Sequence, residues 1–166
     1  MLILSNSLFS CVVNERDSLS SQDNVIGSWE VKEIRWITTD TVFIIEKPQP
    51  GLLMVDSKRY SFMWTPTEEP RIPFEKLAYP TNEEILTGFR SIVFNAGTYN
   101  IKDSIFNIKA SIAKVPGFEG GTQKFKYNIE KDTLVLKMID ETYPSGNKPD
   151  WYGQVETRFT LLRIKE

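Results

Sequence analysis

The stretch "GSWEVKEIRW", Gly27–Trp36, decides the fold of this protein. It opens the first part of the chain with a regular pattern, and it carries two tryptophans, Trp29 and Trp36, in a segment with the character of a β-strand. Charged residues between the two indoles break the alternation of apolar and polar side chains, which indicates a β-bulge. Two such large side chains in one strand indicate that this segment faces a protein interior.

The residues after this stretch alternate with a period of two, as half-buried strands do. In Phe106–Ile112 the apolar residues share one face and the polar residues the other. Further strands are expected at Trp29–Ile37, Thr41–Ile45, Gly51–Val55, Arg59–Trp64, Gly97–Ile101, Phe125–Ile129, Leu134–Met138 and Val155–Leu161. Eight or nine such strands, several joined by short polar turns, predict an all-β protein whose antiparallel sheet closes into a barrel and so loses its exposed edges.

One segment departs from the strand pattern. Thr81 and Glu84 stand at the first and last positions of a capping box, and apolar residues then follow with helical spacing. We therefore expect one helix, over about residues 82–94, between the two halves of the barrel. The proline-rich segment before it, residues 64–80, is expected to be an irregular loop of a length that often serves as a lid or a binding loop.

The composition excludes several classes of function. The chain has 166 residues, which suits one domain with a substantial core, and it has no histidine, so Ser-His-Asp and Cys-His catalysis are excluded. Cys11 is the single cysteine and can form neither an internal disulfide nor a cysteine-based zinc site. We expect no metal and no cofactor. The formal net charge is -2 with the two signs interspersed, which argues against nucleic acid as a partner.

The first 24 residues differ from the rest and are expected to form a flexible segment before the domain, which covers residues 25–166. The four residues that end at Cys11, "LFSC", resemble a lipobox, in which a small residue precedes the cysteine that is lipidated. One interpretation is the remnant of a lipoprotein signal and tether, with Cys11 attaching the protein to a membrane of the bacterial cell envelope. The other is a disordered N-terminus of a cytoplasmic protein with an incidental cysteine.

Several motifs, in their order along the chain, resemble those of a known family. "GSW" at Gly27–Trp29 resembles the G-x-W that opens lipocalins, "AGTYNI" follows the expected helix at Ala96–Ile101, and "FTLLRIKE" closes the chain. The pattern covers Val25–Glu166 and resembles the bacterial and fungal lipocalin-like domain family of the calycin superfamily. The resemblance implies a lipocalin-like antiparallel barrel of eight to nine strands.

By the same resemblance, Gly27, Trp29 and Arg163 form the closed end of the barrel, with the arginine of the last strand lying across the tryptophan. The strand periodicity supports this pairing independently, because Arg163 shares a face with Phe159 and Leu161. Trp29 is therefore expected to have a structural role.

The aromatic residues on the inner face leave two interpretations open. They either line a pocket or fill the barrel as ordinary core, because an eight-stranded barrel is just wide enough for either. The expected ligand-binding set is Trp36, Phe62, Trp64, Tyr99, Phe106, Phe125, Tyr127 and Met138. Trp151 and Tyr152, in the loop before the last strand, either fold over the mouth of the barrel or belong to a plain surface loop.

We expect the barrel to bind a small apolar or amphipathic molecule. The alternatives are a cofactor-free isomerase or cyclase on the same barrel, and a structural envelope protein with a filled barrel. The candidate acids and bases are Glu33, Glu156 and Tyr127. Glu156 is expected to face outward and Glu33 to lie at the bulge, so they form no catalytic pair and no catalytic residue is assigned.

The lipoprotein interpretation of Cys11 predicts where the protein is found. The full-length product should fractionate with membranes, and Cys11→Ser should release it, because the lipid is the anchor. Fractionation of cells that produce the untagged protein measures this. Recovery of the unaltered protein entirely in the cytosolic fraction contradicts the interpretation.

Overall fold

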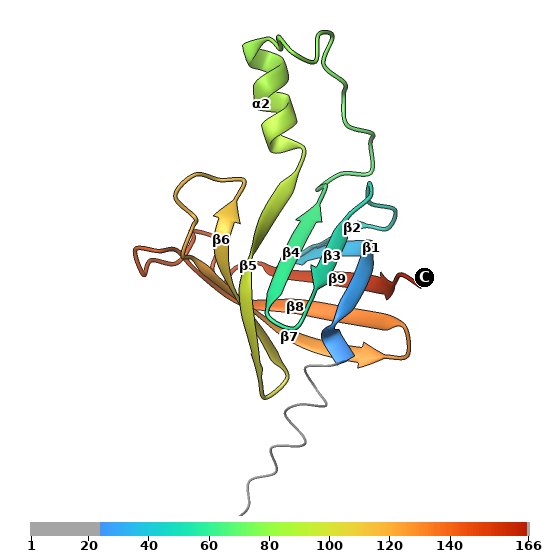
Figure 1. Cartoon of the computed structure of the whole chain (residues 1–166), viewed down its shortest axis with the longest axis vertical. Coiled ribbons are helices and arrows are strands. Elements are labelled where there is room, and N and C mark those ends of the chain that lie inside the picture. Colours follow the sequence, from blue (N-terminus) through green and yellow to red (C-terminus); the bar gives the residue numbers. More distant parts are fainter. Residues whose placement is uncertain (1–23, 166) are drawn as a thin grey trace, which may run out of the picture.

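The structure, a computed structural model, describes residues 24–165 and confirms the predicted all-β barrel. The nine strands are β1 (Gly27–Ile37), β2 (Val42–Ile45), β3 (Leu52–Val55), β4 (Arg59–Trp64), β5 (Val93–Lys102), β6 (Ile105–Ala113), β7 (Thr122–Glu130), β8 (Thr133–Thr142) and β9 (Glu156–Arg163). They form one antiparallel sheet in the order β2-β1-β3-β4-β5-β6-β7-β8-β9, and the additional pairing of β1 with β9 closes eight of them into a ring (Figure 1). Cys11 and the rest of the predicted N-terminal segment up to residue 23 lie outside the described residues.

Strand β1 closes the ring because it pairs along both of its edges. On one edge it pairs with β9 over nearly its whole length, from Trp29 opposite Arg163 to Ile37 opposite Glu156. On the other edge it pairs with β3 near its start and with β2 near its end. Residues 46–51 separate β2 from β3 and include two prolines, which cannot donate to a ladder. Strand β2 is thus an extra strand beside the ring of eight.

The predicted bulge in β1 is confirmed at Lys32. Val31 and Glu33 pair with consecutive residues of β9, so Lys32 is an extra residue, and it is exposed. Trp29 and Trp36 are seven residues apart, an odd spacing that puts two side chains on opposite faces of a regular strand. The extra residue restores a common face, and both indoles pack against the interior of the barrel.

The two ends of the barrel differ in their connections. The closed end holds the start of β1 and the short β3–β4, β5–β6 and β7–β8 turns. The other end, here called the mouth, holds longer connections at residues 65–81, 114–121 and 143–155, together with helix α2 (Asn82–Arg90). In Figure 1, α2 stands beyond the mouth, above β4 and β5, while the β3–β4 and β5–β6 turns lie at the lower end.

Two further bulges lie in the half of the barrel nearer the mouth. The extra residue is Ser111 in β6, opposite β5, and Ile139 in β8, opposite β7. After each bulge, side chains that a regular alternation assigns to the outer face point inward, and those that it assigns to the inner face point outward. Gly97 of β5 permits the first of them, because a Cβ at this position would lie only 2.0 Å from the carbonyl oxygen of Lys109.

Trp29 fills the closed end. Its side chain is 0% exposed, and its indole N–H donates to the carbonyl oxygen of Val25 at 2.8 Å. The guanidinium of Arg163 lies over the indole, 3.9 Å from the ring centroid, and donates to two backbone carbonyl groups that precede β1. Gly27, at φ +135°, leaves room for this guanidinium, because a Cβ there would lie 2.8 Å from Arg163 Nη1.

Helix α2 ends earlier than the sequence predicts. Its start is as expected, because Thr81 and Glu84 form both hydrogen bonds of the capping box. It ends at Arg90 instead of near residue 94, and Val93 and Phe94 begin β5, paired with the end of β4. The ladder hydrogen bonds of the closed sheet outweigh the helical spacing of these two apolar residues. Val93 is β-branched and Phe94 is aromatic, and both types of residue fit a strand well.

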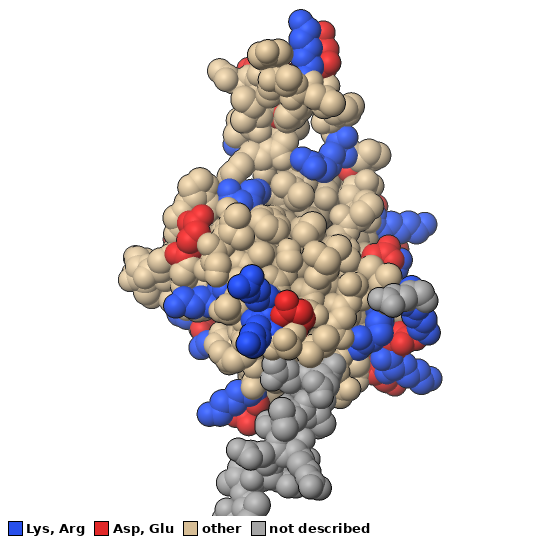
Figure 2. Space-filling view, in the orientation of Figure 1, with Lys and Arg blue, Asp and Glu red and all other residues tan. Residues whose placement is uncertain are grey.

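Helix α2 packs loosely on the barrel. None of its residues is buried, and its apolar side chains Ile85, Leu86 and Phe89 are 42–50% exposed. Lys114, just after β6, ties it to the barrel, because its ammonium donates to the Phe89 carbonyl oxygen at 2.7 Å and lies 4.3 Å from the centroid of the Phe89 ring. In Figure 2, the upper part of the molecule that contains α2 shows few charged side chains below its upper tip. Within residues 24–165 no helix is long and apolar enough to cross a membrane.

Trp29→Ala is expected to lower the free energy of unfolding by about 3–5 kcal/mol, the range for truncation of a large buried aromatic side chain. Denaturant unfolding followed by circular dichroism measures the loss. Leu162→Ala, next to Arg163 but on the exposed outer face, is the control and should change the free energy by less than about 0.5 kcal/mol. A loss of less than about 1 kcal/mol for Trp29→Ala contradicts its structural role.

Candidate functional site

The barrel is solid toward its closed end and hollow at its mouth. Above Trp29, buried apolar side chains form one continuous core, in which the Phe62 and Phe159 rings meet edge to face with centroids 5.0 Å apart. At the other end lies a cavity of about 340 Å³, here called the mouth cavity. It is lined by Trp36, Trp64, Val93, Gln123, Met138, Glu141, Trp151, Val155 and Thr157.

Three of the eight predicted ligand-binding residues line the mouth cavity, namely Trp36, Trp64 and Met138. They come from β1, β4 and β8, so residues distant in sequence meet at one end of the barrel. Met138 packs against the core and also faces the cavity. These three residues provide much of the apolar surface on which a ligand could lie.

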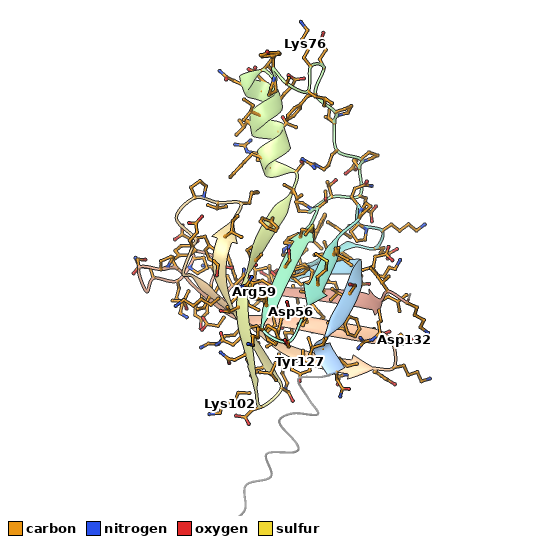
Figure 3. The ribbon with its side chains drawn as sticks, in the orientation of Figure 1. Asp56, Arg59, Lys76, Lys102, Tyr127 and Asp132 are labelled. Carbon is orange, nitrogen blue, oxygen red and sulfur yellow. The ribbon has the colours of Figure 1, made fainter. Side chains whose placement is uncertain are left out.

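The other five predicted residues do not line the mouth cavity. Phe62, Phe106 and Phe125 are only 1–4% exposed and belong to the core. Tyr99 and Tyr127 lie toward the closed end, and Figure 3 shows Tyr127 low in the barrel, far from α2. The Tyr99 hydroxyl donates at 2.6 Å to the carbonyl oxygen of the first residue of the β3–β4 turn. All five share the inner face with the cavity residues, and only their depth in the barrel separates the two groups.

Three indole rings contribute to the cavity wall. The Trp36 and Trp64 centroids are 6.1 Å apart with the planes inclined by 45°, and Trp64 also rests edge-on against Phe159 of the core, at 5.1 Å. Trp151, from the loop at residues 143–155, supplies a third indole. This loop therefore contributes to the cavity, although its Tyr152 is exposed.

A polar cluster lies on the inner wall of the mouth. The carboxylate of Glu141, in β8, accepts a hydrogen bond from Nε2 of Gln123, in β7, at 2.5 Å. Oε1 of Gln123 in turn accepts one from Nδ2 of Asn95, in β5, at 3.2 Å. Gln123 and Glu141 also line a neighbouring cavity of about 410 Å³, here called the lateral cavity, together with Asn95, Lys114 and Tyr143.

Glu141 is a carboxyl group withdrawn from water. Burial raises its pKa, the hydrogen bond from Gln123 opposes this effect, and the nearby charge of Asp140 adds to it. No salt bridge in the described part of the chain involves Glu141, whereas Asp140, one residue before, pairs with Lys124 and Lys148. The mouth cavity thus contains one ionisable residue, and this residue has no partner of opposite charge.

The sequence analysis missed Glu141 because of the bulge at Ile139. Met138 faces the interior, so an unbroken alternation assigns residue 141 to the outer face. The extra residue turns Glu141 inward and leaves Ile139 exposed. Gln123 could have been found from the alternation alone, because it shares the inner face with Phe125.

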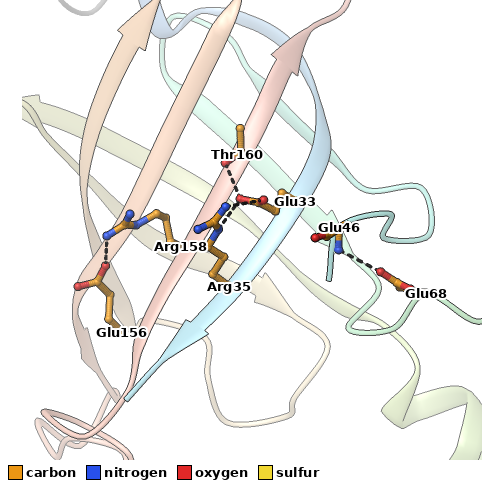
Figure 4. Close-up of polar contacts among 7 residues, drawn as sticks. All are labelled: Glu33, Arg35, Glu46, Glu68, Glu156, Arg158 and Thr160. Carbon is orange, nitrogen blue, oxygen red and sulfur yellow. Dashed lines mark hydrogen bonds and ion pairs between the residues drawn. The ribbon is translucent and has the colours of Figure 1, made fainter. Parts of the chain in front are cut away.

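The two glutamates considered from the sequence lie away from the cavity. Figure 4 shows Glu33 bound by Arg35 and Thr160, and Glu156 bound by Arg158. The hydrogen bonds from Arg35 lower the pKa of Glu33, which favours the ionised carboxylate. Neither glutamate joins the polar cluster at the mouth.

The arrangement at the mouth combines an apolar wall with a polar cluster, so it offers both kinds of contact to a molecule that enters the cavity. Three indoles and Met138 face a carboxylate and a side-chain amide across one cavity. Within residues 24–165 no group of three or more His, Cys, Asp or Glu side chains is placed to hold a metal ion together.

The raised pKa of Glu141 predicts a pH-dependent stability. The folded chain keeps the proton of this carboxyl to a higher pH than the unfolded chain does, so stability is lost as the pH rises above the unfolded value of about 4.3 and through the folded pKa. Relative to the natural protein, Glu141→Gln should gain more stability at about pH 8 than at about pH 4, because it has no charge to bury.

Denaturant unfolding over this pH range measures the effect. Glu75→Gln, which removes a carboxyl from an exposed loop, is the matched control and should leave the profile unchanged. If the profile of Glu141→Gln runs parallel to that of the natural protein, the burial of this carboxyl has no energetic consequence.

A comparison with known families bears on the whole barrel. A family model described as the lipocalin-like domain matches residues 26–162, from just before β1 to the end of β9. No curated protein matches the sequence significantly. The match includes the tryptophan of the closed end and every residue that lines the mouth cavity. With its closed ring of eight antiparallel strands and this match, the chain belongs to the lipocalin-like domain family.

Proposed function

We propose that the barrel binds a small molecule whose apolar body fills the mouth cavity. The observation that carries the proposal is the contrast within one barrel: the closed half is solid core, while the mouth contains about 340 Å³ of space lined in part by three indoles. Ligand sites in proteins are typically concave and mostly apolar, about 300–1,000 Å³ in volume, with a few polar groups that orient the ligand. The mouth cavity has each of these properties.

The core below the cavity limits the size of the ligand. Trp64 packs against Phe159, which is 0% exposed, and Phe62 also packs against Phe159. A long chain could enter the closed half only by displacing these close-packed rings, and such displacement is costly. The ligand is therefore a compact molecule, or the compact end of a larger one that extends through the mouth.

Membership of the lipocalin-like domain family supports the proposal, because a closed barrel of eight strands is a scaffold able to hold one small ligand. The two other functions considered from the sequence make different predictions. A structural protein with a filled barrel binds no small molecule, whereas an isomerase or cyclase returns the bound molecule in altered form.

Titration with 1-octanol, followed by isothermal calorimetry and by tryptophan emission, tests the proposal. We expect saturable binding and a change in emission, because three indoles line the cavity. Met138→Trp places a larger side chain in the cavity and reduces its free volume. It should weaken binding by about tenfold or more, while the unfolding midpoint stays near that of the natural protein. Ile139→Trp, one residue further and on the outer face, is the matched control and should bind 1-octanol normally.

Two outcomes contradict the proposal. One is a natural protein that binds no 1-octanol and carries no co-purifying molecule in native mass spectrometry. The other is a Met138→Trp protein that unfolds as an overpacked core does, which indicates a filled barrel.

A further inference from the structure

The mouth cavity contains a carboxyl group whose charge, when it is ionised, is balanced by no basic side chain of the described residues. Glu141 lines the cavity, its pKa is raised by burial, and it receives one hydrogen bond, from the neutral amide of Gln123. Oδ1 of Asn95, at the far end of the same hydrogen-bonded chain, is buried and accepts no hydrogen bond from the described residues. The cluster thus has more acceptors than donors, and a buried charge without a partner is costly to the folded protein.

The nearby basic side chains are engaged elsewhere. Lys124 and Lys148 pair with Asp140 on the outer face. Lys114, which lines the lateral cavity, has its ammonium on the carbonyl oxygen and ring of Phe89 in α2. The residues that line the mouth cavity include no lysine and no arginine.

Indole rings face the same space as this carboxylate. Trp36 and Trp64 stand 6.1 Å apart at an inclination of 45°, and Trp151 adds a third ring from the loop over the mouth. The face of an aromatic ring carries partial negative charge and attracts ammonium groups, most strongly for tryptophan, and proteins bind alkylated ammonium groups in cages of such rings. The apolar wall and the polar cluster therefore favour the same kind of ligand.

We propose that the mouth cavity selects an organic cation, a small alkylammonium or arylammonium compound whose charged nitrogen lies among the indoles and next to Glu141. The proposal rests on the proposed function, since it names the chemical class of the ligand for the same cavity. A cation supplies the counter-charge that Glu141 lacks. A neutral ligand leaves the carboxylate unpaired, and an anion adds a second negative charge in a site of low polarity.

Three probes with the same eight-carbon chain test the charge preference: octyltrimethylammonium, 1-octanol and octanoate. Isothermal calorimetry at about pH 8, where more of Glu141 is ionised than at lower pH, should give octyltrimethylammonium an affinity at least about tenfold above that of 1-octanol, with octanoate the weakest. The trimethylammonium group has no proton to lose. Any fall in its affinity at lower pH therefore comes from the protein.

The groups that could contribute to such a fall are Glu141 itself, Asp140 beside it, and Lys114 and Tyr143 of the lateral cavity. Glu141→Gln separates them, because it keeps the size of the side chain and removes its charge. In this variant octyltrimethylammonium should bind no better than 1-octanol, and its pH dependence should disappear. Asp140→Asn removes a negative charge one residue away, on the outer face, and should keep the preference for the cation.

The outcomes distinguish this proposal from the one on which it rests. If 1-octanol binds saturably and octyltrimethylammonium binds equally or more weakly, the cavity binds small molecules but does not select cations. If the preference for the cation persists in full in Glu141→Gln, it comes from the indole rings or from the overall charge of the protein, and the role given to Glu141 is overturned. If none of the three probes binds, both proposals fail.

Discussion

The pairing of β1 along both of its edges is the constraint on which the rest of the barrel depends. One strand must reach from the closed end to the mouth and present inward side chains at both, although its two tryptophans have an odd spacing. The bulge at Lys32 makes this possible. It allows Trp29 to carry the Arg163 guanidinium at the closed end, an interaction worth about 1–2 kcal/mol when desolvated. The same strand then places Trp36 in the wall of the mouth cavity.

Much of the fold could be predicted from the sequence, because a half-buried strand repeats every two residues and a capping box marks the start of a helix. The limits of that approach have a physical cause. A bulge is an extra residue in one strand relative to its partner, so the sequence of β8 alone does not reveal the bulge at Ile139. The inward orientation of Glu141 therefore could not be predicted. The alternation of apolar and polar residues also gives no information on how far along the barrel axis a side chain lies. Phe106 and Trp64 are both aromatic and both face inward, yet one is core and the other lines a cavity.

Close packing and open space are separated along the axis of this barrel. The closed half contains the close-packed aromatic core, which provides the burial that favours folding. The mouth contains the features that cost stability: a half-buried carboxyl, a buried amide oxygen without a hydrogen bond in the described chain, and incompletely covered indoles. Proteins tolerate such features where function requires them, because the rest of the structure compensates. The residues that line the cavity could therefore change considerably while the core maintains the fold.

Strand β2 leaves an open sheet edge beside the closed ring in the described chain. Closing a sheet into a ring leaves no open edge, but β2 lies beside the ring and pairs only with β1 in the described chain. Its residues Val42, Phe43 and Ile44 are apolar and 37–59% exposed. Beyond it, the backbone N–H group of Glu46 donates to the Glu68 carboxylate (Figure 4). The backbone N–H group of residue 47 donates to the same carboxylate, and two prolines follow. These neighbours limit the open edge to four residues, and a short edge offers little backbone for another strand to pair with.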